Sequence, residues 1–120
     1  LAIEDGRGPD AEKLARDAVA MFASQSAPDS EAIARATLAV ALQAQGRHAA
    51  AEAEARRAVA LIRNPQHLLA RLPVTIAAAR VKSQTNPKAA LADLDTARME
   101  AVVHGIPRYE FEARRAAAEI

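Results

Sequence analysis

Apolar residues recur every three or four positions along most of the chain, and glycine, proline and serine separate the successive stretches. This period is that of an amphipathic helix with one face in a core. The separating residues are those expected in turns and helix caps. The pattern predicts six helices, at about 11–24, 31–45, 47–62, 66–84, 88–104 and 108–120. Pro73 lies inside the fourth, so we expect a kink there or a later helix start.

One short alanine-rich phrase occurs three times in the chain, within the first, third and fifth predicted helices. Its copies begin at Ala11, Ala51 and Ala90, and a second alanine keeps the same register at Ala18, Ala58 and Ala97. The second and sixth helices also share a pattern, in which Glu31, Ala34 and Arg35 recur as Glu110, Ala113 and Arg114. This offset equals the sum of the two steps between copies of the phrase. A fixed period of about 40 residues is typical of stacked helical arrays, which usually bind other proteins.

The composition indicates an all-α protein. Hydrophobic residues are 51% of the chain and charged residues 26%, which is typical of a globular protein. Alanine supplies about a quarter of all residues, and the aromatic residues are Phe22, Tyr109 and Phe111. Because alanine favours helix and has little bulk, helices rich in it can bury surface by approaching one another closely.

The chain has no cysteine, which excludes disulfides, thiolate metal sites and cysteine nucleophiles. The apolar stretch from Ile33 to Leu42 contains Arg35 and is too short to span a membrane. We therefore expect a cytoplasmic protein. Leu1 is not an initiator methionine and the repeated pattern stops at Ile120, so we interpret residues 1–120 as a single array taken from a longer protein.

The formal net charge is +1, but basic residues concentrate in the middle of the chain. The stretch 66–86 holds Arg71, Arg80 and Lys82 and no acidic residue. If these side chains share a face, they favour an acidic surface on a partner. Three separately solvated side chains are the alternative.

Small residues at fixed places in the helix pairs resemble the tetratricopeptide repeat family. In one copy, the positions of the family's Leu-Gly, Tyr, inter-helix Gly and two alanines are occupied by Leu38-Ala39, Leu42, Gly46, Ala51 and Ala58. The next copy has Ala78, Ala90 and Ala97, with Thr85 in place of the glycine. The resemblance implies a right-handed solenoid of antiparallel helix pairs, with about six helices.

Two departures from the family pattern are present. The place of the family's tryptophan holds Arg35 or Val74, and the period exceeds the usual repeat of about 34 residues. The chain looks more like the longer, alanine-rich arrays attached to bacterial signalling kinases and transcription activators. A HEAT-type array or a plain helical bundle remains the alternative, since helix pairs of about 40 residues are also the HEAT unit.

Family members line a concave groove with the first helix of each pair, which here means the second, fourth and sixth predicted helices. The candidate partner-binding residues implied by this resemblance are Thr37, Val40, Gln43, Thr75, Ile76, Ala79, Lys82, Phe111, Arg114 and Arg115. The family's clamp for acidic C-terminal peptides needs Lys and Asn side chains, and the chain has Ala36, Thr37 and Val40 at those places. The resemblance therefore does not extend to that clamp.

Residue patterns that would indicate catalysis were not found. His48, His67 and His104 are too far apart in sequence for a helical metal site, and the four glycines lie in turns rather than in a phosphate-binding motif. The nearly neutral charge and few aromatic residues argue against nucleic-acid binding. We therefore expect no enzyme activity, no cofactor and no metal.

The sequence thus predicts a protein–protein interaction scaffold that binds a partner peptide or domain on its concave face, in a regulatory or sensor region of a bacterial signalling protein. The alternative is a structural spacer or a module that self-associates through its exposed terminal helices.

Overall fold

The computed structural model describes residues 7–62 and 68–120, which form six α-helices and no strand. The all-α class predicted from the sequence is confirmed for this part of the chain. The helices are α1 (Arg7–Ser24), α2 (Pro28–Ala44), α3 (His48–Leu61), α4 (Leu68–Lys82), α5 (Pro87–Val103) and α6 (Pro107–Ala118).

Two helices begin earlier than predicted. Helix α1 begins at Arg7 rather than at about residue 11, with Pro9 in its first turn. Helix α2 begins at Pro28 rather than at about residue 31. In both cases the proline occupies a place where the backbone N–H has no partner within the helix, so its missing donor costs nothing.

Helix α4 continues through Pro73. The expectation of a later start is therefore wrong. A proline inside a helix removes one backbone hydrogen bond. The neighbouring Leu72 and Val74 are almost completely buried, so packing on both sides of the proline holds the helix in place. The predicted first residues of this helix, 66 and 67, lie outside the described residues, as does the predicted turn at 64–65.

Three helices end in the same hydrogen-bonded turn. At the end of α2, the N–H of Gly46 donates to the carbonyl of Gln43 and the N–H of Arg47 to that of Leu42. This arrangement needs a left-handed residue, and Gly46 has a φ of 77°. The end of α5 repeats it with Gly105, whereas α1 places Ser26 there with a φ of 51°. The two glycines therefore act in turns, as the sequence indicated.

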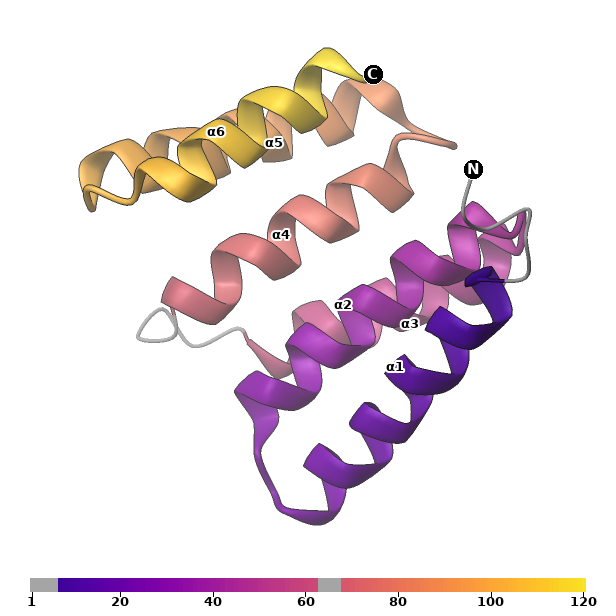
Figure 1. Ribbon diagram of the computed structural model, residues 1–120. Helices are drawn as coiled ribbons and strands as arrows, with labels where there is room; N and C mark the ends of the chain where they lie inside the picture. The colour runs from indigo at the N-terminus through magenta and orange to yellow at the C-terminus, as the bar shows by residue number, and fades with distance from the viewer. Residues whose placement is uncertain (1–6, 63–67) are drawn as a thin grey trace.

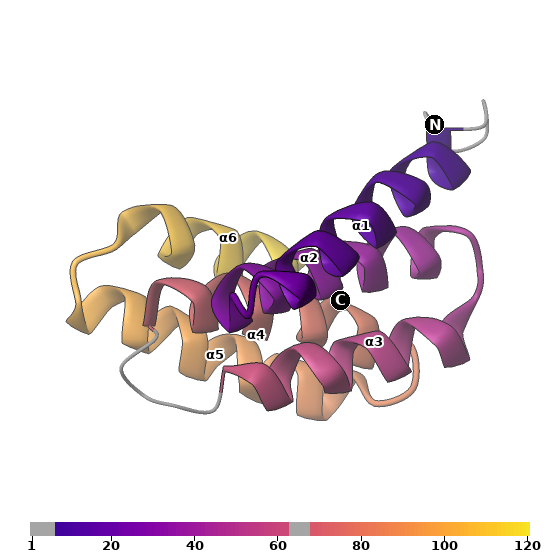
Figure 2. The ribbon, with the colours of Figure 1, turned by 90° about the horizontal axis from the view of Figure 1, so that it is seen from below.

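Helix α4 runs between two groups of helices, α1–α3 and α5–α6 (Figure 1). It packs against α2, α3, α5 and α6, while α2 packs against α1, α3 and α4. Seen from below, α3 and α5 lie along one side of α4, and α2 and α6 along the other (Figure 2). Each helix therefore packs against the next one along the chain, and α4 also connects the two groups.

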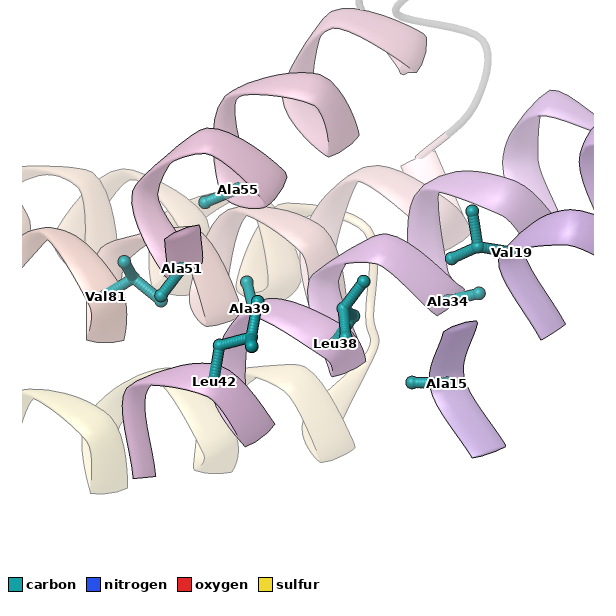
Figure 3. Packing of buried hydrophobic residues seen from close by; sticks show 9 residues of the cluster. All are labelled: Ala15, Val19, Ala34, Leu38, Ala39, Leu42, Ala51, Ala55 and Val81. Carbon is teal, nitrogen blue, oxygen red and sulfur yellow. The ribbon is translucent and has the colours of Figure 1, made fainter. Parts of the chain in front are cut away.

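The core consists of adjoining clusters of small and medium-sized apolar side chains. In one of them, Leu38, Ala39 and Leu42 of α2 meet Ala51 of α3 and Val81 of α4 (Figure 3). The register alanines of the second and third copies of the phrase are central to these clusters, since Ala51, Ala58, Ala90 and Ala97 are all at most 1% exposed. A larger residue at any of these places would push two helices apart. In the first copy Ala11 is exposed and Ala18 is half-buried. The second and third copies of the phrase therefore serve packing.

Burial shows how the helix pairs correspond. Positions 34, 36, 39 and 41 of α2 are buried, and so are the positions of α4 with numbers higher by 40, namely 74, 76, 79 and 81. The sequence alignment paired Ala39 with Ala78, but the fully buried equivalent of Ala39 is Ala79. The step from α4 to α6 is shorter by one, because Ala70 and Val74 correspond to the packed Tyr109 and Ala113. The overall offset between α2 and α6 is kept, but the assignment within α4 moves by one residue.

A buried ion-pair network joins α2 to α3. The guanidinium of Arg35 donates to Glu54 on α3 and to Glu31 on its own helix, with both N–O distances 2.8 Å. The other carboxylate oxygen of Glu54 accepts from Arg57, also at 2.8 Å. Burial of the guanidinium opposes its charge, but the hydrogen bonds to Glu31 and Glu54 outweigh this effect and raise the pKa of Arg35.

Glu12 connects α1 to the turn after α2. It accepts hydrogen bonds from Arg16, Gln45 and Arg47. The bond from Arg16 has the largest effect on the carboxyl group. Partial desolvation opposes it, and the bonds from Gln45 and Arg47 reinforce it, so the pKa of Glu12 lies below its ordinary value of 4.5. A carboxyl group with a lowered folded-state pKa stabilises the fold above its unfolded-state pKa, and that contribution is lost as the pH falls through the folded value.

We therefore expect Glu12→Gln to lower the free energy of unfolding at pH 7, and the difference from wild type to shrink steadily below about pH 4.5. Urea denaturation over a pH series measures this difference. Asp17→Asn is the control on the same helix, because Asp17 has one exposed ion pair, to Lys13. An effect of Glu12→Gln that stays constant down to acid pH would contradict the electrostatic origin.

Candidate functional site

The predicted partner-binding residues do not lie on one face. On α2, Thr37 is exposed and Val40 is 40% exposed, so both are available to a partner. Gln43 instead faces α4, where its Nε2 donates to the carbonyl of Arg80 at 3.0 Å. Its Oε1 is buried with no hydrogen-bond partner among the described residues. Gln43 is therefore part of the contact between α2 and α4.

The four predicted residues of α4 divide into two groups. Ile76 and Ala79 are 4% and 1% exposed and belong to the cluster packed against α5, so their predicted place on an open face is wrong. Thr75 and Lys82 point to the side of α4 on which α3 and α5 lie. This division follows from the one-residue shift of register, because one residue turns a side chain by about 100° around the helix.

On α6, Phe111, Arg114 and Arg115 are all exposed. In the register of the repeat, Phe111 and Arg115 are the equivalents of Leu72 and Ile76, which pack against α5. Phe111 and Arg115 therefore lie on the face of α6 that corresponds to the face of α4 packed against α5, and they do not line a groove. Arg114 pairs with Glu110 of its own helix at 2.8 Å.

A hollow lies between α3 and α5, with α4 as its floor. We call it the outer groove. It has a volume of about 600 Å³ and is partly open to solvent. Its lining residues are Glu52, Ala55, Arg56 and Val59 of α3, Thr75, Ala78, Val81 and Lys82 of α4, Thr85 after α4, and Asp93 of α5.

The outer groove has an apolar floor and charged rims. Ala55, Val59 and Ala78 are among the residues that form the apolar part. On one rim Arg56 lies 3.8 Å from Glu52, and on the other Lys82 lies 2.6 Å from Asp93. All four charged side chains are at least one third exposed, so these ion pairs are readily exchanged for contacts with a ligand.

The equivalent space in the first unit, α1 to α3, is filled by the protein itself. At the places equivalent to Thr75, Ala78 and Thr85, α2 and the turn after it carry the larger Arg35, Leu38 and Gln45. Leu38 is buried, and the guanidinium of Arg35 reaches Glu54, the equivalent of Asp93. Val19 is 9% exposed, whereas its equivalent Val59 is 39% exposed. The outer groove is therefore open because small side chains replace large ones at the same places.

A second hollow of about 460 Å³ repeats the outer groove further along the chain. It lies between α5 and α6, and its lining includes Leu91, Leu94, Asp95, Arg98, Arg114 and Ala117. These six residues are the repeat equivalents of residues that line the outer groove; for example, Leu91 corresponds to Glu52 and Ala117 to Ala78. A seventh lining residue, Ala113, corresponds to Val74, which does not line the outer groove. The hollow is thus present beside α3 and again beside α5, whereas the equivalent space beside α1 is filled.

The basic stretch in the middle of the chain does not form an unpaired patch. Arg71 pairs with Glu100, Arg80 with Glu119 at 2.8 Å, and Lys82 with Asp93. These carboxylates come from α5 and from the residue after α6. The tertiary structure therefore neutralises the cations on which the expectation of an acidic partner was based.

The described residues offer no cluster of three or more His, Cys, Asp or Glu side chains that could hold a metal. His48 begins α3 and His104 caps α5, both exposed, and His67 lies outside the described residues. No helix in the described ranges is long and apolar enough to cross a membrane. No family model, curated protein or solved structure matches the chain.

The sequence-based list missed Glu52, Arg56, Val59 and Asp93. A usable signal was present: when α4 is aligned with α2 so that Ala79 matches Ala39, Thr75 and Ala78 replace Arg35 and Leu38. Smaller side chains at two neighbouring inward-facing positions of one repeat indicate a hollow in that repeat.

Proposed function

We propose that the chain is a tetratricopeptide-like array of helix pairs that acts as a protein–protein interaction scaffold, and that the outer groove receives a segment of the partner. One observation supports the groove most directly. The first unit, α1 to α3, fills this space with its own Arg35 and Leu38, and the second unit, α3 to α5, leaves it open. A partner that supplies the missing side chains regains the burial that the first unit already has.

The first unit also indicates the chemistry of the partner. An aliphatic side chain covers the apolar floor, and a guanidinium pairs with the carboxylate on the opposite helix, as Leu38 and Arg35 do with Glu54. The corresponding carboxylate in the outer groove is Asp93, now paired with Lys82. We therefore propose a partner segment with neighbouring aliphatic and arginine side chains, whose guanidinium takes the place of Lys82 beside Asp93.

The face of α2 and α4 that lies away from α3 and α5 is the second candidate. The exposed apolar side chains Ile33, Val40 and Leu69 support it. Because α2 and α4 pack against each other, these residues lie on neighbouring helices. A site on this face keeps the sequence-based proposal that the second and fourth helices bind the partner. Leu69 then replaces Ile76 and Ala79 among the binding residues, because those two are buried.

The double variant Thr75→Arg with Ala78→Leu is expected to close the outer groove by restoring the side chains of the first unit. Its free energy of unfolding should be unchanged or higher by about 1–2 kcal/mol, because the added groups bury apolar surface and reach Asp93. Peptides selected from a displayed random library against wild type should carry paired aliphatic and arginine residues. They should bind the double variant at least about tenfold more weakly, which corresponds to the loss of one good contact.

The matched control is Thr37→Arg with Ala44→Leu, which makes the same changes on exposed positions of α2. Selected peptides should bind this control as they bind wild type. Loss of binding in the control but not in the groove variant would place the site on the α2 face instead. Selection of mainly acidic peptides would overturn the proposed partner chemistry.

A further inference from the structure

Each rim of the outer groove carries one carboxylate, and both carboxylates have a counterpart in the first unit. In the register of the repeated phrase, Glu52 corresponds to Glu12 and Asp93 corresponds to Glu54. The side chains of Glu12 and Glu54 are only 15% and 9% exposed, whereas those of Glu52 and Asp93 are at least one third exposed. The rim carboxylates of the outer groove are therefore the uncovered copies of a pair that the first unit encloses.

In the first unit each of these carboxylates binds two cations, one through each oxygen. The Oε2 atom of Glu12 accepts from Arg16 of the same helix at 2.8 Å. Its Oε1 atom accepts from Arg47 at 2.7 Å and from the amide of Gln45 at 3.2 Å, and both of these donors lie in the turn after α2. Glu54 follows the same rule, with one guanidinium from α2 and one from α3.

In the second unit each carboxylate has one cation. The Oε2 atom of Glu52 lies 3.8 Å from Arg56 of its own helix, which is too far for a hydrogen bond. The Oδ2 atom of Asp93 accepts from Lys82 at 2.6 Å. Among the residues that the structure describes, no cation lies within ion-pair distance of the other oxygen of either carboxylate. One oxygen on each rim is therefore available to a cation from outside.

The turn after α4 is one residue shorter than the turn after α2, because it has no counterpart of Gly46. In the first of these turns the N–H groups of Gln45 and Arg47 donate to the same carbonyl near the end of α2. In the second, the N–H groups of Thr85 and Asn86 donate to the carbonyl of the last residue of α4. Thr85 and Asn86 are therefore the equivalents of the two residues that bind Glu12.

Neither replacement binds Glu52. The side chain of Thr85 is short, and its hydroxyl donates to the carbonyl of the last residue of α4 at 3.3 Å. The side chain of Asn86 caps α5, where it accepts a backbone N–H at 3.1 Å. The place that Arg47 fills beside Glu12 is thus open beside Glu52, at the end of the outer groove that Thr85 also lines.

We infer that Glu52 is a second cation-binding position of the outer groove, so that the partner segment carries two basic side chains, one for each rim, and an aliphatic side chain for the floor. This inference rests on the proposed function, which already places one of the cations beside Asp93. The second cation takes the place that Arg47 has in the first unit and forms a charge-assisted hydrogen bond to Glu52.

The cation that already lies beside Glu52 does not exclude this arrangement. Arg56 is the equivalent of Arg16, which stays bound to one oxygen of Glu12 while Arg47 binds the other. Arg56 is also 73% exposed, so it can turn into solvent. The first unit therefore shows that a carboxylate at this place holds two guanidinium groups at once.

Peptides selected against wild type from a displayed random library should carry two basic residues. They are then synthesised with arginine at both places, and each arginine is replaced in turn by citrulline, its uncharged isostere. One replacement should weaken binding to wild type about fivefold but leave binding to Glu52→Gln unchanged, because that variant has already lost the contact. The other replacement should behave in the same way with Asp93→Asn.

Asp17→Asn is the matched control, because it removes the same charge from an exposed position of α1 and should bind the peptides as wild type does. Peptides with a single basic residue, or a Glu52→Gln variant that binds as tightly as wild type, would overturn the inference. The proposed function would still stand if the double variant that closes the groove lost binding. A selection in which no peptide responds to that double variant would overturn both.

Glu52→Gln should keep the circular dichroism spectrum and unfolding midpoint of wild type, because the side chain has one distant and exposed ion pair. Weaker binding by this variant is then a loss of the contact rather than of the fold.

Discussion

Replacing Arg35 by alanine is expected to lower the free energy of unfolding by about 3 kcal/mol, because it leaves carboxylates in a largely buried site without their main partner. The side chains of Arg35 and Glu54 are only 20% and 9% exposed. Glu54 would keep one partner, Arg57, whose own side chain is mostly in solvent. The methylene groups of Arg35 would also be lost from the space between α1 and α3.

Urea denaturation followed by circular dichroism measures this loss. Arg57→Ala is the matched control, because it removes the other cation bound to Glu54 from a position that is 61% exposed, and it should cost less than about 1 kcal/mol. Equal losses for Arg35→Ala and Arg57→Ala would contradict the conclusion that Arg35 fills the first unit. Arg35→Leu should recover part of the loss through apolar contact but leave Glu54 short of a partner.

Replacing Ala79 by leucine is expected to destabilise the protein by about 2–3 kcal/mol, whereas Ala78→Leu should be neutral or stabilising. Ala79 is 1% exposed among Leu72, Leu94 and other core residues, so a larger side chain must displace a helix. Ala78 lines the outer groove, where a leucine covers Val59 much as Leu38 covers Val19. Two adjacent alanines should thus respond in opposite ways.

Thermal and urea denaturation of the two single variants measure the difference directly. Ala39→Leu is a further control, because Ala39 is the buried equivalent of Ala79 in the first pair and should respond like it. If Ala78→Leu were the more damaging change, Ala78 rather than Ala79 would be the equivalent of Ala39. The description of the outer groove as an unfilled copy of the first unit would then fail.

The positions of the helices, and the recurrence of the alanine-rich phrase in every second helix, were predictable because both depend on residues that are close together in the sequence. Proline and glycine mark the ends of most helices, as at Pro87 and Gly105, and the spacing of apolar residues gives the helical period between them. The burial of alanines in the repeated phrase was also predicted, because a small residue that recurs at a fixed interval marks a place where two helices touch. The early start of α1 was missed because the regular spacing of apolar residues begins only at Ala11, whereas the first turn contains Gly8 and Pro9.

The site was less predictable, and α4 shows why. The run Ala77-Ala78-Ala79 offers three small residues in succession, so composition alone could not decide which of them corresponds to Ala39. Burial decides it, because Ala79 contacts the core against α5 and Ala78 faces the outer groove. An error of one residue then placed Ile76 and Ala79 on an open face.

The sequence by itself determined the helical class, the alternation of two kinds of helix and the close packing of the repeated alanine phrase, because these depend on residues within one or two turns of each other. The tertiary structure alone decided which cations are neutralised, as for Arg71, Arg80 and Lys82, since their carboxylate partners come from α5 and from the residue after α6, later in the chain. It also decided that one copy of a repeated space is filled by Arg35 and Leu38 and the next is open. A hollow is defined by side chains from three helices at once, and no single stretch of sequence contains them all.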